Sequence, residues 1–440
     1  MSKFFSMRTV PLMFATALAM TSNFAQAANN GAPQPYPCAV SNDWITAPNP
    51  PQEVPDGANA QFCQFYQFSW QWFLQLVQPS NIVPTVRNFE VDEFFPQLRT
   101  AADGTSLNSC GTGLQGTRQF KLVGLKARHA DGSEVVSKAI NQAGSTASIY
   151  DKHRNVVYYE VRFSRDMCGV TSGGNFPSGI TEIKTAWRVL TKEDDARRYY
   201  SVKTVVQGAS DKPMLLGLVG FHLARSTTLH PEFVWATFEH KDNSPDCFKH
   251  ETVWQRPSKW SFASDEAARC LQKEDPFTCS LKFPYNGAGN SSFKGDQGAP
   301  TPICRVYPNG TRSTDNKAAE NNAVVDELNR QLVGPKGLLT KLDDKNPMAV
   351  WKNYFNVGAI WFNQPAPTDP DQLNADQRGS LQLASSVMET TYQGGAQKIN
   401  GKISFNNALN CFACHSYSPT QPTTTSGVSH IFNQIHGTKK

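Results

Sequence analysis

The hydrophobic pattern predicts strands in the middle of the chain. Between residues 118 and 240, short runs rich in Val, Ile, Tyr and Phe are separated by clusters of Gly, Asp and Ser. In "ITEIKTAWRVL", 180–190, Glu182 and Lys184 alternate with the apolar or β-branched residues beside them. Alternation with period two is typical of strands, and the short separators leave no room for crossover helices. We therefore expect an antiparallel sheet, folded as a sandwich or half-barrel.

Other segments predict helices. Residues 61–77, "QFCQFYQFSWQWFLQLV", are too densely apolar for a surface strand and predict a buried helix that ends before Pro79. Residues 318–333 predict a second helix, and residues 374–393 carry apolar side chains at helical spacing. The segment 347–362 is compatible with a helix or a bent strand.

These elements predict an α+β protein. Its antiparallel β-rich central domain precedes a helical C-terminal region. The expected parts are a leader (1–27), a Pro-rich lead-in with the aromatic helix (28–117), the β domain (118–240), a loop region tied by disulfides (241–317) and the helical region (318–440).

The N-terminal residues have the pattern of a secretory signal peptide. Lys3 and Arg8 precede an apolar run from Val10 to Met20, and Ala25-Gln26-Ala27 matches a cleavage site. The run is shorter than the roughly 20 apolar residues of a membrane span. We expect cleavage after Ala27 and an exported, periplasmic protein. No later stretch is long and apolar enough to predict a membrane span in the mature chain.

Composition and charge exclude some functions. The 440 residues include 42 Lys and Arg against 37 Asp and Glu, a formal net charge of +5. This balance is weak and dispersed, which argues against nucleic acid as a partner. The 27 Phe, 12 Tyr and 9 Trp provide large side chains for a packed core.

The ten cysteines divide into two groups. Two of them belong to a motif near the C-terminus, and an even number of cysteines in an exported chain indicates disulfides. Cys270 and Cys279 are close enough in sequence to close a local loop. The alternative to four disulfides is that some of these cysteines are buried free thiols. The eight cysteines outside the motif are Cys38, Cys63, Cys110, Cys168, Cys247, Cys270, Cys279 and Cys304.

The motif is Cys411-x-x-Cys414-His415, which is typical of covalent haem c attachment. Cysteines three residues apart on a helical turn lie on about the same side, so both can form thioethers with one porphyrin. The following histidine then provides the proximal iron ligand. We expect one haem c, held by Cys411 and Cys414, with iron bound by His415.

Two other interpretations of the motif remain open. A thioredoxin-like redox pair is expected at the start of a helix that follows a strand, whereas residues 406–410 have loop character. A zinc site needs further ligands, which His430 and His436 would complete.

Four stretches resemble a family of exported bacterial monohaem c-type cytochrome proteins with a C-terminal motif. They are "ITEIKTAWRVL", "GLVGFHLARSTTLHPEFVWATFEH", "VMETTYQ" and "NCFACH", and the resemblance covers most of residues 60–432. It implies haem, export and the c-type cytochrome class, and no particular reaction.

The sequence favours electron transfer to a redox partner protein by Fe(II)/Fe(III) cycling. The alternative is a haem enzyme of peroxidase or oxygenase type with an open distal site. Its acid–base groups would come from His222 with Arg225, or from Glu239 with His240. Bacterial dihaem peroxidases need two attachment motifs, and this chain has one. Haem-based sensing, or a structural role in a larger redox complex, is a third possibility.

A closed site needs a sixth iron ligand. Met388 is the first candidate, because the expected helix 374–393 would fold back over the ring, and a thioether suits an apolar wall. His430, 15 residues after His415, is the alternative. The remaining possibilities are His222, His436 and an open position.

Overall fold

The computed structural model describes the chain from Cys38 onward with internal gaps, and Cys38–Lys440 form one compact unit. The expected signal peptide, 1–27, lies outside the described residues. The described residues are 38–56, 59–101, 105–111, 121–122, 126–128, 134–136, 149, 151–153, 155–171, 176–206, 209–247, 260–274, 278–279, 282, 303–305, 307–363, 376–389, 396–399, 402–405, 411–415 and 428–437.

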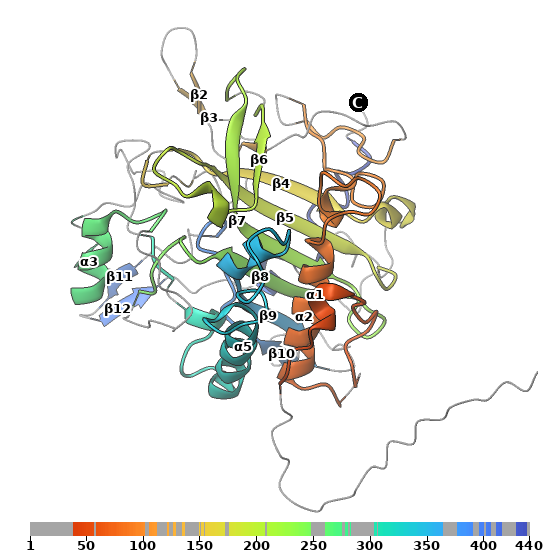
Figure 1. The fold of residues 1–440 in the computed structure, drawn as a ribbon. Helices are drawn as coiled ribbons and strands as arrows, with labels where there is room; N and C mark the ends of the chain where they lie inside the picture. The colour runs from red at the N-terminus through yellow and green to blue at the C-terminus, as the bar shows by residue number, and fades with distance from the viewer. Residues whose placement is uncertain are drawn as a thin grey trace, which may run out of the picture. The chain divides into compact units, whose positions relative to one another are not determined.

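An antiparallel sheet of eight described strands forms the centre of the fold (Figure 1). Its order is β1-β4-β5-β7-β8-β9-β10, and β6 pairs with the start of β7. The antiparallel sheet expected within 118–240 is confirmed, and β9 and β10 extend it from later in the chain. The strands are β1 (Lys121–Leu122), β4 (Tyr158–Phe163), β5 (Thr181–Val189), β6 (Ser201–Thr204), β7 (Met214–Arg225), β8 (Val234–His240), β9 (Tyr354–Phe362) and β10 (Gln377–Gly379).

The remaining described strands form two small pairs. β2 (Lys126–Arg128) pairs with β3 (Glu134–Val136), and β11 (Ala396–Ile399) pairs with β12 (Lys402–Phe405). The expected α+β class with an antiparallel sheet is therefore confirmed. A second large layer of strands, which a sandwich needs, is not found among the described residues.

The helices predicted at 61–77 and 318–333 are both present. The first corresponds to α2, in which Gln61 and Gln64 form a capping box at the N-terminus. The α-helices are α1 (Asp43–Thr46), α2 (Phe62–Leu76), α3 (Asp265–Lys273), α5 (Ala318–Val333) and α8 (Cys411–Cys414). The 3₁₀ helices are η2 (Asn88–Glu90), η3 (Arg165–Gly169), η4 (Ala196–Arg198), η5 (Pro308–Gly310) and η6 (Ala349–Asn353).

Helix α2 covers one face of the sheet at β8 and β9, and α5 packs beside it (Figure 1). The Phe73 ring stacks on Phe238 of β8 with ring centroids 4.0 Å apart, and it meets Phe221 of β7 edge to face. Phe65 stacks in the same way on Trp361 of β9. Aromatic pairs of this geometry add to the free energy gained by burial. The densely apolar segment 61–77 therefore supplies the helical side of the main hydrophobic core.

The helix predicted for 374–393 is wrong. The described part of this segment is β10 followed by turns through residue 389. Its backbone is bound to distant strands instead, because Tyr159 donates a hydrogen bond to Val387 O at 2.5 Å and Ser386 N–H donates to Glu239 at 2.6 Å. Gly379 has a φ of 88°, a left-handed conformation that ends β10.

The segment 347–362, for which the sequence allows a helix or a bent strand, consists mainly of η6 and β9. All nine residues of β9 are buried. A strand that is covered on both faces has a continuous apolar pattern rather than an alternating one. This is why its sequence resembled a buried helix.

All eight cysteines outside the motif form disulfides. The pairs are Cys38–Cys63, Cys110–Cys168, Cys247–Cys304 and Cys270–Cys279. The expected Cys270–Cys279 loop is confirmed. The two bridges between residues 247 and 304 lie in one buried cluster with Leu271, so the disulfides form most of that cluster.

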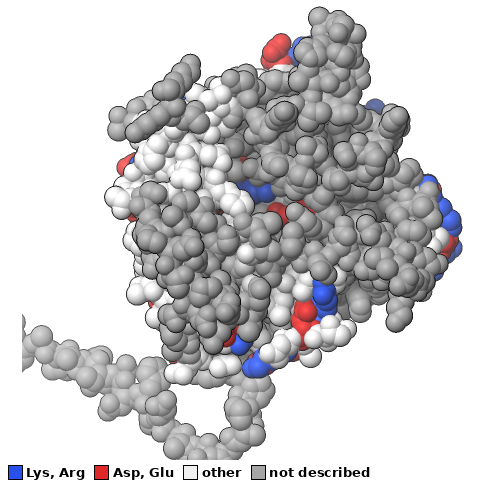
Figure 2. Space-filling model, turned by 180° about the vertical axis from the view of Figure 1, so that it is seen from behind, with Lys and Arg blue, Asp and Glu red and all other residues white. Residues whose placement is uncertain are grey.

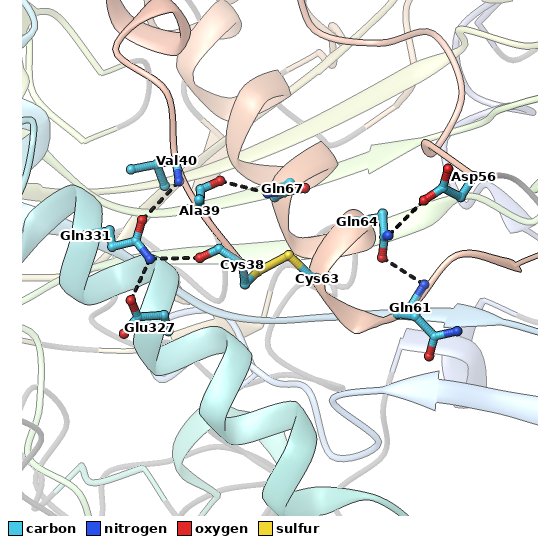
Figure 3. The surroundings of a disulfide bond; sticks show 10 residues. All are labelled: Cys38, Ala39, Val40, Asp56, Gln61, Cys63, Gln64, Gln67, Glu327 and Gln331. Carbon is cyan, nitrogen blue, oxygen red and sulfur yellow. Dashed lines mark hydrogen bonds between the residues drawn. A yellow bond between two sulfur atoms is a disulfide. The ribbon is translucent and has the colours of Figure 1, made fainter. Parts of the chain in front are cut away.

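The Cys38–Cys63 bridge attaches the start of the described chain to α2 (Figure 3). Gln331 of α5 reinforces the attachment, since its amide donates to Cys38 O at 2.7 Å and accepts from Val40 N–H at 3.0 Å. Gln67 of α2 donates to Ala39 O at 2.7 Å. Residues 38–40 are therefore held by both helices.

The disulfides predict unequal losses of stability. Replacing Cys110 and Cys168 by Ser opens a loop with a sequence separation of 58, whereas replacing Cys270 and Cys279 opens one of 9. In the chain-entropy model the first change costs about 1.5 kcal/mol more. Denaturant unfolding of both double variants measures the difference. Equal losses, or free thiols among the eight cysteines in protein purified without reductant, would contradict the prediction.

Candidate functional site

The motif forms a single helical turn. Helix α8 spans Cys411–Cys414, and the N–H of His415 donates to Cys411 O at 2.7 Å. Residues 411 and 414 are thus one turn apart on a helix, as double thioether attachment requires. The side chain of Cys414 lies outside the described atoms.

The His415 imidazole is held by three neighbours. Its Nδ1 lies 2.8 Å from Val428 O. Its ring lies 4.3 Å, centroid to centroid, from that of Trp235, and it stacks on His430 at 3.9 Å with an interplanar angle of 16°. Because a carbonyl oxygen only accepts, Nδ1 carries the proton and donates. Nε2 then keeps its lone pair for a metal.

Aromatic side chains of β8 and β9 form the floor beneath the motif. Phe412 stacks on Phe362 at 4.2 Å, and Trp235 lies edge-on to Phe412 at 6.5 Å. The Trp235 indole N–H donates to Glu232 O at 3.0 Å, which fixes the ring. Trp361, the neighbour of Phe362, faces α2. Because side chains alternate along a strand, Trp235 and Phe362 belong to the opposite face. We call it the site face.

The surroundings keep His415 neutral at ordinary pH. The residue is half-buried, but Trp235 and His430 cover its ring. Burial, together with the adjacent His430, lowers the pKa of His415 to about 3. Lys184 and Glu389 lie near enough to act on the same pKa. A neutral imidazole is the form that binds iron.

These residues fit a covalently attached haem. The helical turn sets the spacing of the cysteines, the hydrogen bond from Nδ1 leaves Nε2 as the ligand atom, and the floor is apolar. His415 is the residue that would bind the iron, and Cys411 and Cys414 would carry the thioethers. Among the described residues, no group of three or more His, Cys, Asp or Glu side chains is arranged for a bare metal ion.

The structure places the two candidates for the sixth ligand differently. Met388 is fully buried in a cluster with Tyr159, Val219 and Val387, separate from the cluster that contains Phe412. His430 is exposed and stacks on His415. His436, also exposed, forms a β-bridge with Asn108.

His222 and Arg225 lie on opposite faces of the sheet. His222 is on the site face, where Nδ1 lies 2.8 Å from Thr237 Oγ1 and Nε2 lies 2.8 Å from Glu389 Oε1. The Arg225 guanidinium lies 3.3 Å from the ring centroid of Trp72 on α2. They are three positions apart on one strand, so alternation separates them.

Glu239 and His240 each make contacts within the fold, and these contacts are with different partners. Glu239 accepts from the N–H and hydroxyl of Ser386, each at 2.6 Å, and forms an ion pair with Arg305 at 3.2 Å. His240 stacks on Tyr199 at 4.0 Å, and its Nε2–H donates to Arg198 O at 3.0 Å. Burial lowers the pKa of His240 to about 4, so it is neutral.

The sequence analysis missed residues that the sheet brings to the motif. Trp235 and Val428 contact His415, and Glu182 of β5 lies on the same face of the sheet as Trp235 through its pairing with Ala224. The alternation in "ITEIKTAWRVL" had already placed Glu182 and Lys184 on one face. Nothing local in the sequence indicated that this face carries the motif.

Comparison of the chain with models of known protein families, with characterised proteins and with solved structures finds no match. The resemblance to exported monohaem cytochromes therefore stays a prediction, as does the function that it implies.

The position of Met388 can be tested by packing. A methyl group added at Gly220 would lie 2.9 Å from Met388 Cε and 2.8 Å from Val387 Cγ2. Gly220→Ala is therefore expected to cost about 1–3 kcal/mol of unfolding free energy through overpacking. Met388→Ala makes room, so the two costs should fall short of additivity by about 0.5 kcal/mol or more.

Denaturant unfolding of the two single variants and the double variant measures this coupling. Gly169→Ala is the matched control, because a methyl group there meets nothing within 4 Å. Additive costs would mean that Met388 does not pack on Gly220.

Proposed function

We propose that this protein is an exported c-type cytochrome that carries one covalent haem and passes single electrons between redox partners. Cys411 and Cys414 attach the haem, and His415 is the proximal ligand. The observation that carries the proposal is the hydrogen bond from His415 Nδ1–H to Val428 O. It leaves Nε2 as the ligand atom on a residue that directly follows a C-x-x-C helical turn.

When bound, the haem supplies an iron that cycles between Fe(II) and Fe(III). The protein's own residues orient and shield the site. Val428 O fixes the tautomer and the rotation of His415, an interaction that tunes metal-bound histidines in general. Trp235 and Phe362 provide an apolar floor that excludes water. Low polarity around an iron centre is one of the factors that set its reduction potential.

His430 is the preferred sixth ligand in this proposal. Met388 was the first candidate through the expected helix 374–393, and the described part of that segment is not a helix. Met388 packs in another buried cluster, whereas the ring of His430 lies 3.9 Å from that of His415. The two rings are stacked nearly parallel, so His430 has to swing away from His415 to bind the iron from the opposite side of the haem.

The alternative, a haem enzyme with an open distal site, has less support. Both ring nitrogens of His222 have partners, and Arg225 lies on the face of the sheet that α2 covers. Glu239 and His240 form hydrogen bonds with other parts of the fold. A distal acid–base group has to reach a substrate at the iron. None of these candidates has a hydrogen-bonding group that is both near His415 and unengaged among the described residues.

The location and the partner complete the proposal. Four disulfides favour an oxidising compartment, and we place the protein in the periplasm. The described residues include no helix that is long and apolar enough to cross a membrane. Described acidic and basic side chains are scattered over the face in Figure 2. Weak redox encounters need only small local patches, so the redox partner is not identified by charge.

Haem attachment is tested first. The protein, exported by a strain with a c-type maturation system, should retain haem in a denaturing gel and after acid–acetone extraction. Cys411→Ala and Cys414→Ala should each lose two-point attachment, which the pyridine haemochrome spectrum detects. The matched control is the Cys270→Ser, Cys279→Ser pair, which should keep full haem content. Colourless wild-type protein, which carries no haem, would contradict the proposal.

The sixth ligand is tested by spectroscopy. Wild-type ferric protein should be low-spin, and the ferrous form should bind carbon monoxide slowly. His430→Ala should become high-spin and bind carbon monoxide rapidly, whereas Met388→Ala should keep the wild-type spectrum. A near-infrared methionine–iron charge-transfer band that disappears in Met388→Ala would restore the thioether as ligand. Rapid carbon monoxide binding or robust peroxide turnover by the wild type would favour the enzyme.

A further inference from the structure

The chain returns to the motif in a short run of consecutive turns, residues 428–437, which we call the return segment. The N–H groups of Gln434 and Ile435 donate to Ile431 O at 2.7 and 3.1 Å, and the Gly437 N–H donates to Gln434 O at 3.0 Å. Because these hydrogen bonds follow one another without a break, a shift at one end of the segment is passed to the other. Four of its side chains are buried in the main core: Val428, Ile431, Phe432 and Ile435.

The start of the return segment holds His415. Val428 O accepts the hydrogen bond from His415 Nδ1–H at 2.8 Å. The Phe432 N–H donates to Ser429 Oγ at 3.0 Å, which joins this start to the turns that follow. The partner of one ring nitrogen determines which nitrogen carries the proton. The position of the Val428 carbonyl therefore decides whether Nε2 keeps its lone pair.

The far end of the return segment is fixed to residues 106–109. Ile435 O accepts from the Ser109 N–H at 2.7 Å, and both residues are fully buried. His436 forms an antiparallel bridge with Asn108. The segment is thus held at two places, His415 at its start and residues 106–109 at its end.

Gly437 has no room for a side chain. Its φ of 77° lies in the left-handed region, which favours glycine. An added Cβ would lie 2.9 Å from Asn108 N and 3.2 Å from Leu107 C. These are backbone atoms, which cannot turn aside as the end of a flexible side chain can. The absence of a side chain at this position is therefore what permits the close approach of the two segments.

A disulfide restrains the residues on which Gly437 packs. Cys110 directly follows Ser109, and it is bonded to Cys168 of η3. The bridge limits how far residues 106–109 can move from η3. The end of the return segment consequently lies against a part of the chain that is covalently held.

We propose that Gly437 is a positioning residue for His415. Its close contact with residues 107–108 fixes the end of the return segment, and the segment holds Val428 O against Nδ1–H. The protonation site of the imidazole is thus set from near the C-terminus. For its effect at the iron the inference rests on the proposed function, whereas the tautomer of His415 is a property of the chain alone.

The first experiment measures the reduction potential of the haem protein. Gly437→Ala should keep covalent haem. A histidine that loses its acceptor is a weaker electron donor to a metal, so the equilibrium between Fe(III) and Fe(II) should move about fivefold toward Fe(II), the size of one hydrogen bond. Potentiometric titration followed by absorption measures the shift. An unchanged potential in folded Gly437→Ala would overturn the inference.

The second experiment needs no haem. In a Cys411→Ala, Cys414→Ala background, nitrogen NMR of the imidazole reports the tautomer of His415. The Nδ1–H form should predominate, and adding Gly437→Ala should lower its ratio to the Nε2–H form by about fivefold, for the same reason. An unchanged ratio overturns the inference alone. Wild-type protein without covalent haem overturns the proposed function, and the tautomer still tests the role of Gly437.

Gly179→Ala is the matched control. Gly179 also has a positive φ, 97°, but an added Cβ would lie 3.5 Å from Arg225 Nη2, an ordinary contact outside the return segment. It should lower stability and leave both the potential and the tautomer unchanged. Should Gly437→Ala fail to fold, the Cys110→Ser, Cys168→Ser pair loosens the same attachment without altering the return segment. The same shifts in that pair would support the inference, and wild-type values would overturn it.

Discussion

The alternation of side chains along β7, β8 and β9 is the constraint on which the rest of the structure depends. On one face, Phe221 and Phe238 pack against α2, and on the other face Trp235 and Phe362 support the motif. The sheet is buried on both sides, so the same strands build the core and the candidate site. A register slip of one residue would turn Trp235 toward α2 and leave His415 without its aromatic neighbour.

Local sequence patterns correctly predicted those helices whose formation depends on residues close together in the sequence. Helix α5 has the predicted bounds and α2 nearly so, because each has an apolar face of helical length and a terminal signal. The segment after β10 misled the prediction, since Leu381, Ala384 and Met388 have helical spacing. Hydrogen bonds from Tyr159 and to Glu239 hold this segment in turns, and both partners are far away in sequence.

The candidate site likewise has one part that is contiguous in the sequence and another that only the fold brings together. Its motif is contiguous and could be recognised from sequence. Trp235 and Val428, by contrast, reach His415 only through strand pairing and the return of residues 428–432. His222 and Arg225 are near each other in sequence, yet strand alternation places them on opposite faces. Sequence proximity thus identified the motif and misjudged which polar groups lie on the same face of the sheet.

The Cys247–Cys304 bridge has a consequence for the order of folding. β8 ends at His240 and its partner β9 begins at Tyr354, so the sheet closes over a long connection. The bridge bypasses 57 residues of it, about half. Halving a flexible loop lowers its closure entropy cost by about 0.6 kcal/mol, and contacts distant in sequence slow folding. Oxidation of this pair before β8 meets β9 would therefore speed completion of the sheet, which links the folding rate to the supply of thiol oxidants.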